Sequence, residues 1–290
     1  MEPVRSTVQD ARVDTMRARS VSLARRLLTG AGRASLVAYD LAPLVEAGAL
    51  SHGLSADGDL VVACLADDAV PATTWTDGPL RVRLDILKGA PEWAVRITAC
   101  AVHLLGTLEW LPDELVDGYL ATAGLDPRLA ELATAVGGRL GVIRTDRLLV
   151  HDSAGVLPLS FGEVAGQHPA GGSRVWGFRS FPDAEQEWAA RDLVGRLSAG
   201  QLAGLVTAAT TGWDAGVTLS SRAEVTCSHT EGQVFCVDID RTGLTLMSVV
   251  LGRASVHFLA FDEPADAIDE LADRIGQLVV DAGVVRPRSS

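Results

Sequence analysis

A pair of strand-like segments between residues 80 and 111 most constrains what this chain can fold into. Over residues 80–86 (LRVRLDI), apolar side chains alternate with charged ones, the period-two pattern of a strand with one dry and one polar face. After a break at 89–91, residues 95–110 are again rich in Val, Ile, Thr, Leu and Trp, with Gly106 inside. This second strand exceeds the usual length of about 3–10 residues, and long strands bent at a glycine or bulge are typical of small closed barrels. We therefore expect a β-barrel built on this pair.

Composition and charge limit the classes of function. Hydrophobic residues make up 48% of the 290, enough for a substantial core. The net charge of −12 argues against general nucleic-acid binding, because phosphate contacts need a basic surface. No apolar run of about 18 residues is free of charges or turn signals, so we expect no membrane span. Without a clean signal-peptide core, the sequence favours a cytoplasmic protein with reduced thiols.

The N-terminal half is expected to form the barrel domain, over residues 15–165. Residues 1–14 are polar and are expected to be disordered, and a helix is expected from Thr15 to Leu28. The turn at Asp57-Gly58 predicts a hairpin that leads into the next strand. The remaining expected elements are strands over 33–39, 60–65, 139–152 and 155–161, and helices over 112–123 and 126–136.

The C-terminal half is expected to form a smaller domain, over residues 184–285. Residues 166–183 are rich in glycine and proline and read as the linker, and 286–290 as a disordered tail. Ser198 and Gln201 have the spacing of a capping box, which predicts a helix start at Ser198. The expected elements are helices over 184–197, 201–208 and 265–280, and strands near 223–228, 234–239, 244–250 and 255–261. Helices, then strands, then a helix indicate an α+β domain.

The order of elements and the segment VRITACAVHLLGTLEWLPDE resemble the split-barrel flavin-binding family, the pyridoxamine-phosphate-oxidase-like proteins. The C-terminal stretch resembles the small α+β domain that follows such barrels in haem-utilisation oxygenases and in plant glutamyl-tRNA-reductase-binding proteins. Its most specific part is a D-x-D-R-x-G-L-x-L core, here Asp238, Asp240, Arg241, Gly243, Leu244 and Leu246. The resemblance implies an N-terminal split β-barrel with flanking helices, followed by a smaller α+β domain. It also implies a homodimer that binds FMN or haem between its two barrels.

One segment departs from the flavin-binding pattern. Such proteins usually carry a Ser…His-x-x-Asn-like phosphate segment after the second strand, whereas residues 65–80 contain no asparagine and several acids. Negative charge there would oppose a phosphate. A scaffold that binds no cofactor therefore stays open as an alternative.

Arginines supply the first set of candidate ligand-binding residues. Arg81 and Arg83 lie two residues apart on one strand face, so their guanidinium groups could together hold a phosphate or a haem propionate. The alternative is a solvated or dimer-buried face on which they pair with acids such as Asp85. Lys88 in the following turn could join the same cofactor-binding site, and so could Arg96 in the next strand if the two strands pair directly.

Two histidines are candidates for a haem ligand. His103 shares its strand face with Ala101 and Leu105, and a neutral imidazole can bind iron or move a proton near pH 7. The alternative is a core histidine that is hydrogen-bonded to the backbone. His257 lies in the strand SVHFLAF, and haem-utilisation oxygenases can use a histidine in their C-terminal part.

The cysteines predict no metal site. Cys227, His229 and Cys236 would give zinc only three local ligands, whereas structural zinc sites need four. Buried thiols are the ordinary interpretation.

Three hypotheses of function remain. The first is a protein that binds haem or a flavin at a dimer interface and serves haem or iron metabolism. The second is an enzyme with the same site, either haem-degrading or a flavin-dependent oxidoreductase. The third is a cofactor-free interaction or regulatory protein on the same dimeric scaffold.

Overall fold

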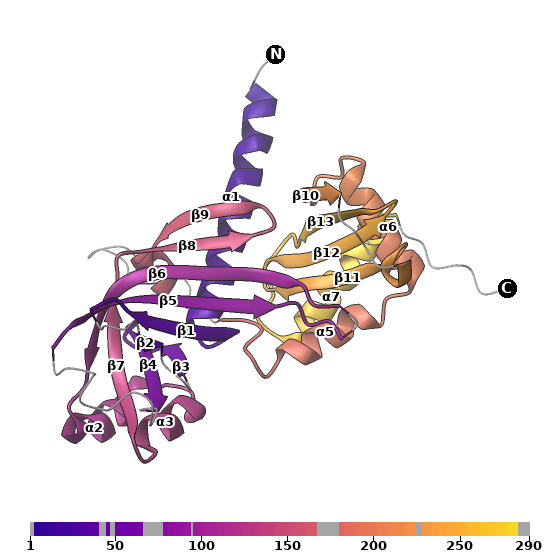
Figure 1. Cartoon of the computed structure of the whole chain (residues 1–290). Helices are drawn as coiled ribbons and strands as arrows, with labels where there is room; N and C mark the ends of the chain where they lie inside the picture. Colours follow the sequence, from indigo (N-terminus) through magenta and orange to yellow (C-terminus); the bar gives the residue numbers. More distant parts are fainter. Residues whose placement is uncertain are drawn as a thin grey trace.

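The protein contains two antiparallel sheets, of nine and four strands, each with its own helices (Figure 1). The structure, a computed structural model, describes residues 3–40, 45–46, 50–65, 78–93, 95–166, 180–223 and 228–283. Most of the acidic segment 66–79, residues 167–179 of the expected linker and the tail 286–290 lie outside the described residues. The architecture confirms the expected α+β class.

The larger sheet, called the barrel sheet below, has the strand order β2-β1-β5-β6-β7-β4-β3, with β8 and β9 branching from β6. Its strands are β1 (Arg33–Ala38), β2 (Val45–Glu46), β3 (Leu50–Leu54), β4 (Leu60–Leu65), β5 (Leu80–Gly89), β6 (Thr98–Trp110), β7 (Gly138–Arg144), β8 (Arg147–Asp152) and β9 (Gly155–Ser160). The sheet curls so that β3 contacts β1. The expected pair of long strands is therefore the centre of this sheet.

The long strand β6 serves two branches of the barrel sheet. Its residues 100–104 pair with β8, and its residues 107–110 pair with β7. Gly106 lies at the change of partner, where a Cβ atom would come within 2.7 Å of the Arg144 carbonyl oxygen. The glycine thus allows the sheet to split at this point.

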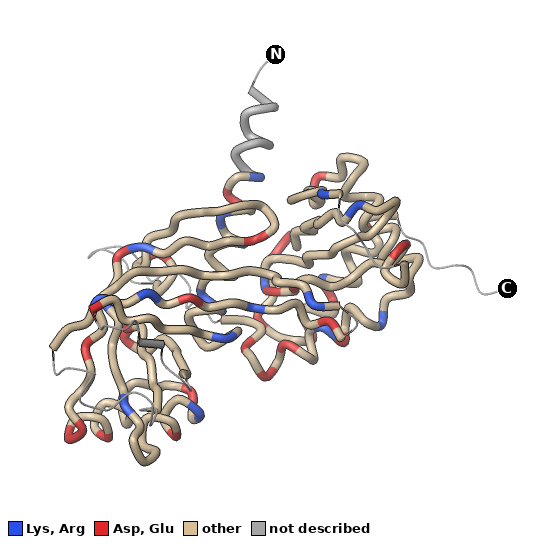
Figure 2. The backbone as a smooth tube through the Cα atoms, viewed as in Figure 1, with Lys and Arg blue, Asp and Glu red and all other residues tan. Residues whose placement is uncertain are grey.

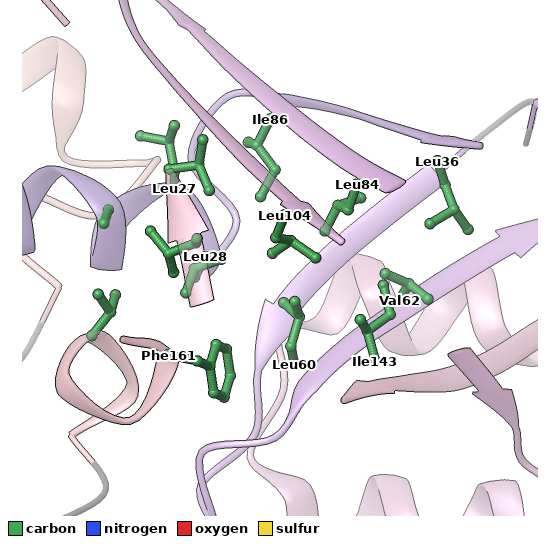
Figure 3. Close-up of a cluster of buried hydrophobic side chains, with 14 of the residues drawn as sticks. Leu27, Leu28, Leu36, Leu60, Val62, Leu84, Ile86, Leu104, Ile143 and Phe161 are labelled. Atoms are coloured by element: carbon green, nitrogen blue, oxygen red, sulfur yellow. The ribbon is translucent and has the colours of Figure 1, made fainter. Parts of the chain in front are cut away.

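The core of the barrel is closed by helix α1 (Pro3–Leu28), which supplies Leu27 and Leu28. Figure 3 shows these two leucines beside Leu60, Ile86 and Phe161, the last from the short helix α4 (Phe161–Ala165). Helices α2 (Asp113–Ala123) and α3 (Pro127–Thr134) cover the other end, around β4 and β7.

The second sheet, called the small sheet, has the order β10-β13-β12-β11. Its strands are β10 (Gly216–Ala223), β11 (Val234–Asp240), β12 (Gly243–Val250) and β13 (Arg253–Ala260), with a 3-10 helix at Ser228–Thr230. Helices α5 (Glu187–Gly195), α6 (Ala199–Thr210) and α7 (Ile268–Asp281) pack on one face of it, where Leu246 meets Leu271 and Ile275. Ser198 and Gln201 form the expected capping box.

Two sequence-based expectations are wrong at element boundaries. Helix α1 begins at Pro3 rather than Thr15, so most of the segment expected to be disordered is helical. Residues 4–14 contain no glycine, and proline is favoured in a first turn, so the helix extends without interruption. The sequence predicts a strand that begins near residue 223, whereas strand β10 ends at Ala223. The prediction missed β10 because its sequence, GVTLSSRA, is largely polar.

Four charged residues join the two sheets, and we call them the junction cluster: Arg26 of α1, Lys88 of β5, Glu187 of α5 and Asp238 of β11. Asp238 accepts hydrogen bonds from Arg26 Nη1 (2.9 Å) and Lys88 Nζ (2.9 Å). Glu187 Oε1 lies 2.6 Å from Arg26 Nη2 and 2.7 Å from Lys88 Nζ. Figure 2 shows basic and acidic residues meeting between the two sheets.

Burial decides the energetics of the junction cluster. The side chains of Arg26, Lys88 and Asp238 are at most 5% exposed. Burial disfavours the charged form of Asp238, but attraction to Arg26 and Lys88 outweighs it and holds the pKa of this carboxyl well below its usual range. Each charge is therefore tolerated only while its partners are present.

The turn between β5 and β6 adds a second contact between the sheets. Glu92 Oε1 accepts a hydrogen bond from the backbone N–H of Cys236 (2.8 Å), and Glu92 Oε2 lies 3.3 Å from Arg191 Nη2. Trp93 stacks on Trp188 of α5 with ring centroids 4.3 Å apart. The start of β6 is thus fixed against the small sheet.

Among the described residues, no helix has both the length and the apolar composition needed to cross a membrane.

Replacing Asp238 with asparagine should lower the free energy of unfolding by about 3–5 kcal/mol, because two buried cations lose their counter-charge. Urea unfolding followed by circular dichroism measures this change. The matched control is Glu263→Gln, which breaks the exposed pair with Arg274 and should cost less than about 1 kcal/mol.

Lys88 offers an independent readout of the same variants, since it is the one lysine of the chain. Acylation of its buried amine, followed by mass spectrometry, should be slow in the native protein and faster in Asp238→Asn. Equal rates in the two proteins, together with equal stabilities, would show that the cluster does not hold the sheets together.

Candidate functional site

A cavity of about 530 Å³ lies between the two sheets. Its barrel-sheet side is formed by residues 95–101, which lead into and begin β6, and by residues 151–153 at the end of β8. Its other side is formed by residues of all four strands of the small sheet. The volume falls in the range of about 300–1,000 Å³ that is typical of small-molecule sites.

Much of the cavity wall is apolar. Ala99 of β6 and Val256 of β13 are buried and pack in one cluster with Ile97 and Met247, and Phe235 also lines the wall. These side chains offer no hydrogen-bonding groups, so this part of the cavity suits a flat or bulky apolar body.

Each sheet contributes one arginine to the cavity. Arg96 comes from the segment before β6, and Arg222 comes from β10. Neither has an ion-pair partner among the described residues, and both side chains are exposed. Two unpaired guanidinium groups can bind carboxylates or phosphates through paired hydrogen bonds.

His151 is the imidazole of the cavity. It lies near the end of β8, and within the described part of the chain its ring nitrogens have no hydrogen-bond partner. Its ring meets that of His103 edge-on, with centroids 4.8 Å apart and an interplanar angle of 83°. The neighbouring Asp152 is instead committed to a buried ion pair with Arg19. An imidazole with free nitrogens in a cavity wall can bind a metal centre.

The structure places Arg81 and Arg83 on the outward face of β5, away from the cavity. Arg81 pairs with Asp40 (Nη2 to Oδ1, 2.6 Å), and Arg83 Nε donates to Asp85 Oδ2 at 2.8 Å. They are thus a surface face paired with acids, the alternative that the sequence left open.

His103 lies on the same outward face, directly across from Asp85 in the strand pairing. Its Nδ1 is 2.6 Å from Asp85 Oδ1, and its side chain is 36% exposed. It contacts His151 but does not itself line the cavity.

Lys88 and His257 lie in packed interiors. Lys88 belongs to the junction cluster. His257 has Nδ1 3.1 Å from Thr218 Oγ1 and Nε2 3.2 Å from Ser248 Oγ, so hydroxyl groups bond both ring nitrogens. Burial lowers the pKa of this imidazole. Both residues therefore have structural partners, and neither reaches the cavity.

Of the six residues proposed from the sequence, the cavity contains only Arg96. Sequence reasoning missed His151 and Arg222. The alternation of residues 147, 149 and 151 could have placed His151 on the same face as His103. Arg222 could have been found only from the correct bounds of β10.

The cysteines that the sequence singled out for a zinc site lie outside the cavity or outside the described residues. Cys227 of the rejected zinc pattern is outside the described residues, and Cys236 is a buried thiol whose pKa is raised by burial. No group of three or more His, Cys, Asp or Glu in the described segments could hold a metal ion.

The outward face of β5, β6, β8 and β9 carries an apolar patch. Leu87, Leu105, Leu149 and Val156 are each 42–65% exposed and share this face with His103. Val156 is the cross-strand partner of His151, which lines the cavity. Large apolar side chains that are exposed together on one face can mark an interaction site.

No protein-family model matches the chain, and no curated protein matches its sequence. A structure described as a heme binding protein from Mycobacterium smegmatis aligns over 92% of this chain and 98% of its own, with 16% identity and a TM-score of 0.51. A protein of unknown function from Agrobacterium tumefaciens aligns over 89% of this chain and 94% of its own (13% identity, TM-score 0.36). ChuZ from Campylobacter jejuni aligns over 59% and 68% (10% identity, TM-score 0.31). The first similarity shows a shared fold, whereas the other two scores are too low to be informative.

The stability of the protein should fall as the pH is lowered below about 6.5, the ordinary pKa of histidine. The buried ring of His257 resists protonation, so the unfolded chain binds a proton that the folded chain does not. His52 is also buried and has a lowered pKa, so it should add to this loss of stability at low pH. The free energy of unfolding, measured with urea between pH 7 and pH 5, should therefore change less with pH in His257→Gln than in the unmodified chain. An equal pH dependence in the variant and the unmodified chain would show that His257 does not contribute to the loss of stability.

Proposed function

We propose that the protein binds haem, or a tetrapyrrole of similar size and charge, in the cavity between its two sheets. The observation that carries this proposal is that three groups line one cavity with a partly apolar wall: Arg96, Arg222 and the free imidazole of His151. The shared fold with a protein described as haem-binding makes haem the first ligand to test.

The residues fit the chemical parts of haem one by one. The apolar wall around Ala99 and Val256 matches the macrocycle. Arg96 and Arg222 would hold the propionates through charge-assisted hydrogen bonds, one from each sheet. The imidazole of His151 would hold the iron, for which imidazole is a common protein ligand.

Bound haem would supply an iron centre for redox chemistry or for binding small gaseous ligands. The protein's own contributions are those of a binding site. The two arginines orient the ligand across the cavity, and the apolar part of the wall excludes water from one side of the ligand. Strand β8 fixes the position of the imidazole. No residue of the cavity assigns a reaction, so the proposal is binding rather than catalysis.

FMN is less well supported than haem. Its phosphate could use the same two arginines, but a flavin has no metal for the imidazole of His151 to bind. The acidic segment that departs from the flavin pattern lies mostly outside the described residues.

Titration of the purified protein with haem should give a Soret band that saturates at one haem per chain. Arg96→Gln and Arg222→Gln should each weaken binding roughly tenfold to a hundredfold, as expected for a lost charged hydrogen-bond pair. His151→Ala should remove the spectral signature of the iron–imidazole bond. Absorption spectroscopy measures all three changes.

The matched control is Arg144→Gln, which removes an exposed, ion-paired arginine of β7 away from the cavity. It should bind haem like the unmodified chain. Loss of binding in Arg81→Gln or Arg83→Gln, but not in the cavity variants, would move the site to the outward face. No spectral change with the unmodified chain would refute haem binding.

The apolar outward face favours a second function, self-association. A second copy of the chain could cover Leu87, Leu105, Leu149 and Val156, and a homodimer would bury this surface. The contact would lie beside His151, so dimer formation would also narrow access to the cavity. The same face would serve an interaction protein that binds no cofactor.

Sedimentation velocity should show a dimer for the unmodified chain and a monomer for the variant Leu105→Arg/Leu149→Arg, because two unpaired charges would enter the apolar contact. Leu115→Arg is the control, since Leu115 is an exposed leucine on α2, away from this face. A monomer in every case would contradict self-association through the patch.

A further inference from the structure

A hydrogen-bonded line of side chains runs across the outward face toward the cavity. Arg83 Nε donates to Asp85 Oδ2 at 2.8 Å, and the other oxygen of this carboxylate lies 2.6 Å from His103 Nδ1. Asp85 and His103 are direct partners in the pairing of β5 with β6. The backbone register and the carboxylate together therefore fix the position and the orientation of the His103 ring.

The fixed ring of His103 meets His151. The two rings stand nearly perpendicular, with centroids 4.8 Å apart. Among the described residues, His103 is the only ring that contacts His151, and none of these residues is hydrogen-bonded to the His151 ring nitrogens. The orientation of His151 in the cavity wall therefore depends on the ring beside it.

The fold itself gains little from this line. The side chains of Arg83 and His103 are 47% and 36% exposed, and exposed ion pairs contribute roughly 0–1 kcal/mol. Leu105 and Leu149, the neighbours of His103 in the sheet, are exposed apolar residues that offer it no polar partner. A polar line within an apolar face calls for a role other than stability.

We propose that Asp85 and His103 are a positioning pair for His151, an inference that rests on the haem-binding function proposed above. Metal-binding histidines usually have their rings oriented by a carboxylate or carbonyl partner. Here the carboxylate acts one step away, since it orients His103, whose ring then limits the rotation of His151.

The test uses the full chain with the substitutions Asp85→Asn and His103→Phe. Phenylalanine keeps a ring beside His151 but loses the bond to Asp85. Haem should still bind, with an affinity lowered roughly tenfold to a hundredfold, as is typical when the partner of a metal ligand is removed. The iron–imidazole stretching band of the ferrous complex, recorded by resonance Raman spectroscopy, should shift in both variants.

Asp40→Asn is the matched control. Asp40 also accepts hydrogen bonds from an arginine of β5, but it has no histidine partner among the described residues. Affinity and band position should be unchanged in this variant. The double variant Asp85→Asn/His103→Phe should lose no more than the single variants, because the pair acts as one unit.

A second measurement separates this inference from the proposed function. In the ligand-free, unmodified protein, the side-chain NMR couplings of His151 should report a single χ1 rotamer. In Asp85→Asn and His103→Phe, the same couplings should report averaging over several rotamers. If no haem binds to any protein but the rotamer result holds, the haem proposal fails and the positioning pair stands. Unchanged rotamers together with an unshifted iron–imidazole band would overturn the positioning pair.

Discussion

The buried carboxylate of Asp238 is the interaction on which the arrangement of the two sheets depends. It belongs to the small sheet, but the groups that neutralise it, Arg26 and Lys88, come from the barrel helix and the barrel sheet. A buried charge without its partners costs several kcal/mol, so neither sheet can keep its charged residues buried alone. Glu187 completes the balance with a second negative charge. The packing of the two sheets is therefore specified by charge as well as by apolar contact.

This packing creates the cavity. Lys88 lies near the end of β5, and the turn that follows carries Glu92 onto the small sheet and leads into the beginning of β6. The start of β6 then faces β12 and β13 across the cavity, and Arg96 and Arg222 line it from the two sides. A ligand with two acidic groups would bind both sheets at once. Its binding should therefore strengthen the contact that the junction cluster sets up.

Sequence reasoning succeeded where the deciding interactions are local. The alternation over 80–86, the Asp57-Gly58 turn and the capping box at Ser198 each predict a structure from neighbouring residues, and each is present. It did not anticipate groups whose partners are distant in the chain. Lys88 looked like a ligand residue because its partner, Asp238, lies 150 positions away. The D-x-D-R motif marked Asp238 as special but could not say that its role is to bind the barrel. His151 gains its interest only from a cavity that the second sheet completes.

A crystal structure of the protein with haem would show whether the ligand site lies between the two sheets. We expect density for one haem per chain in the cavity, with its propionates at Arg96 and Arg222 and its iron on His151. Haem bound instead over Arg81 and Arg83, or at His257, would show that the cavity is not the site. So would crystals grown with saturating haem that contain none between the sheets.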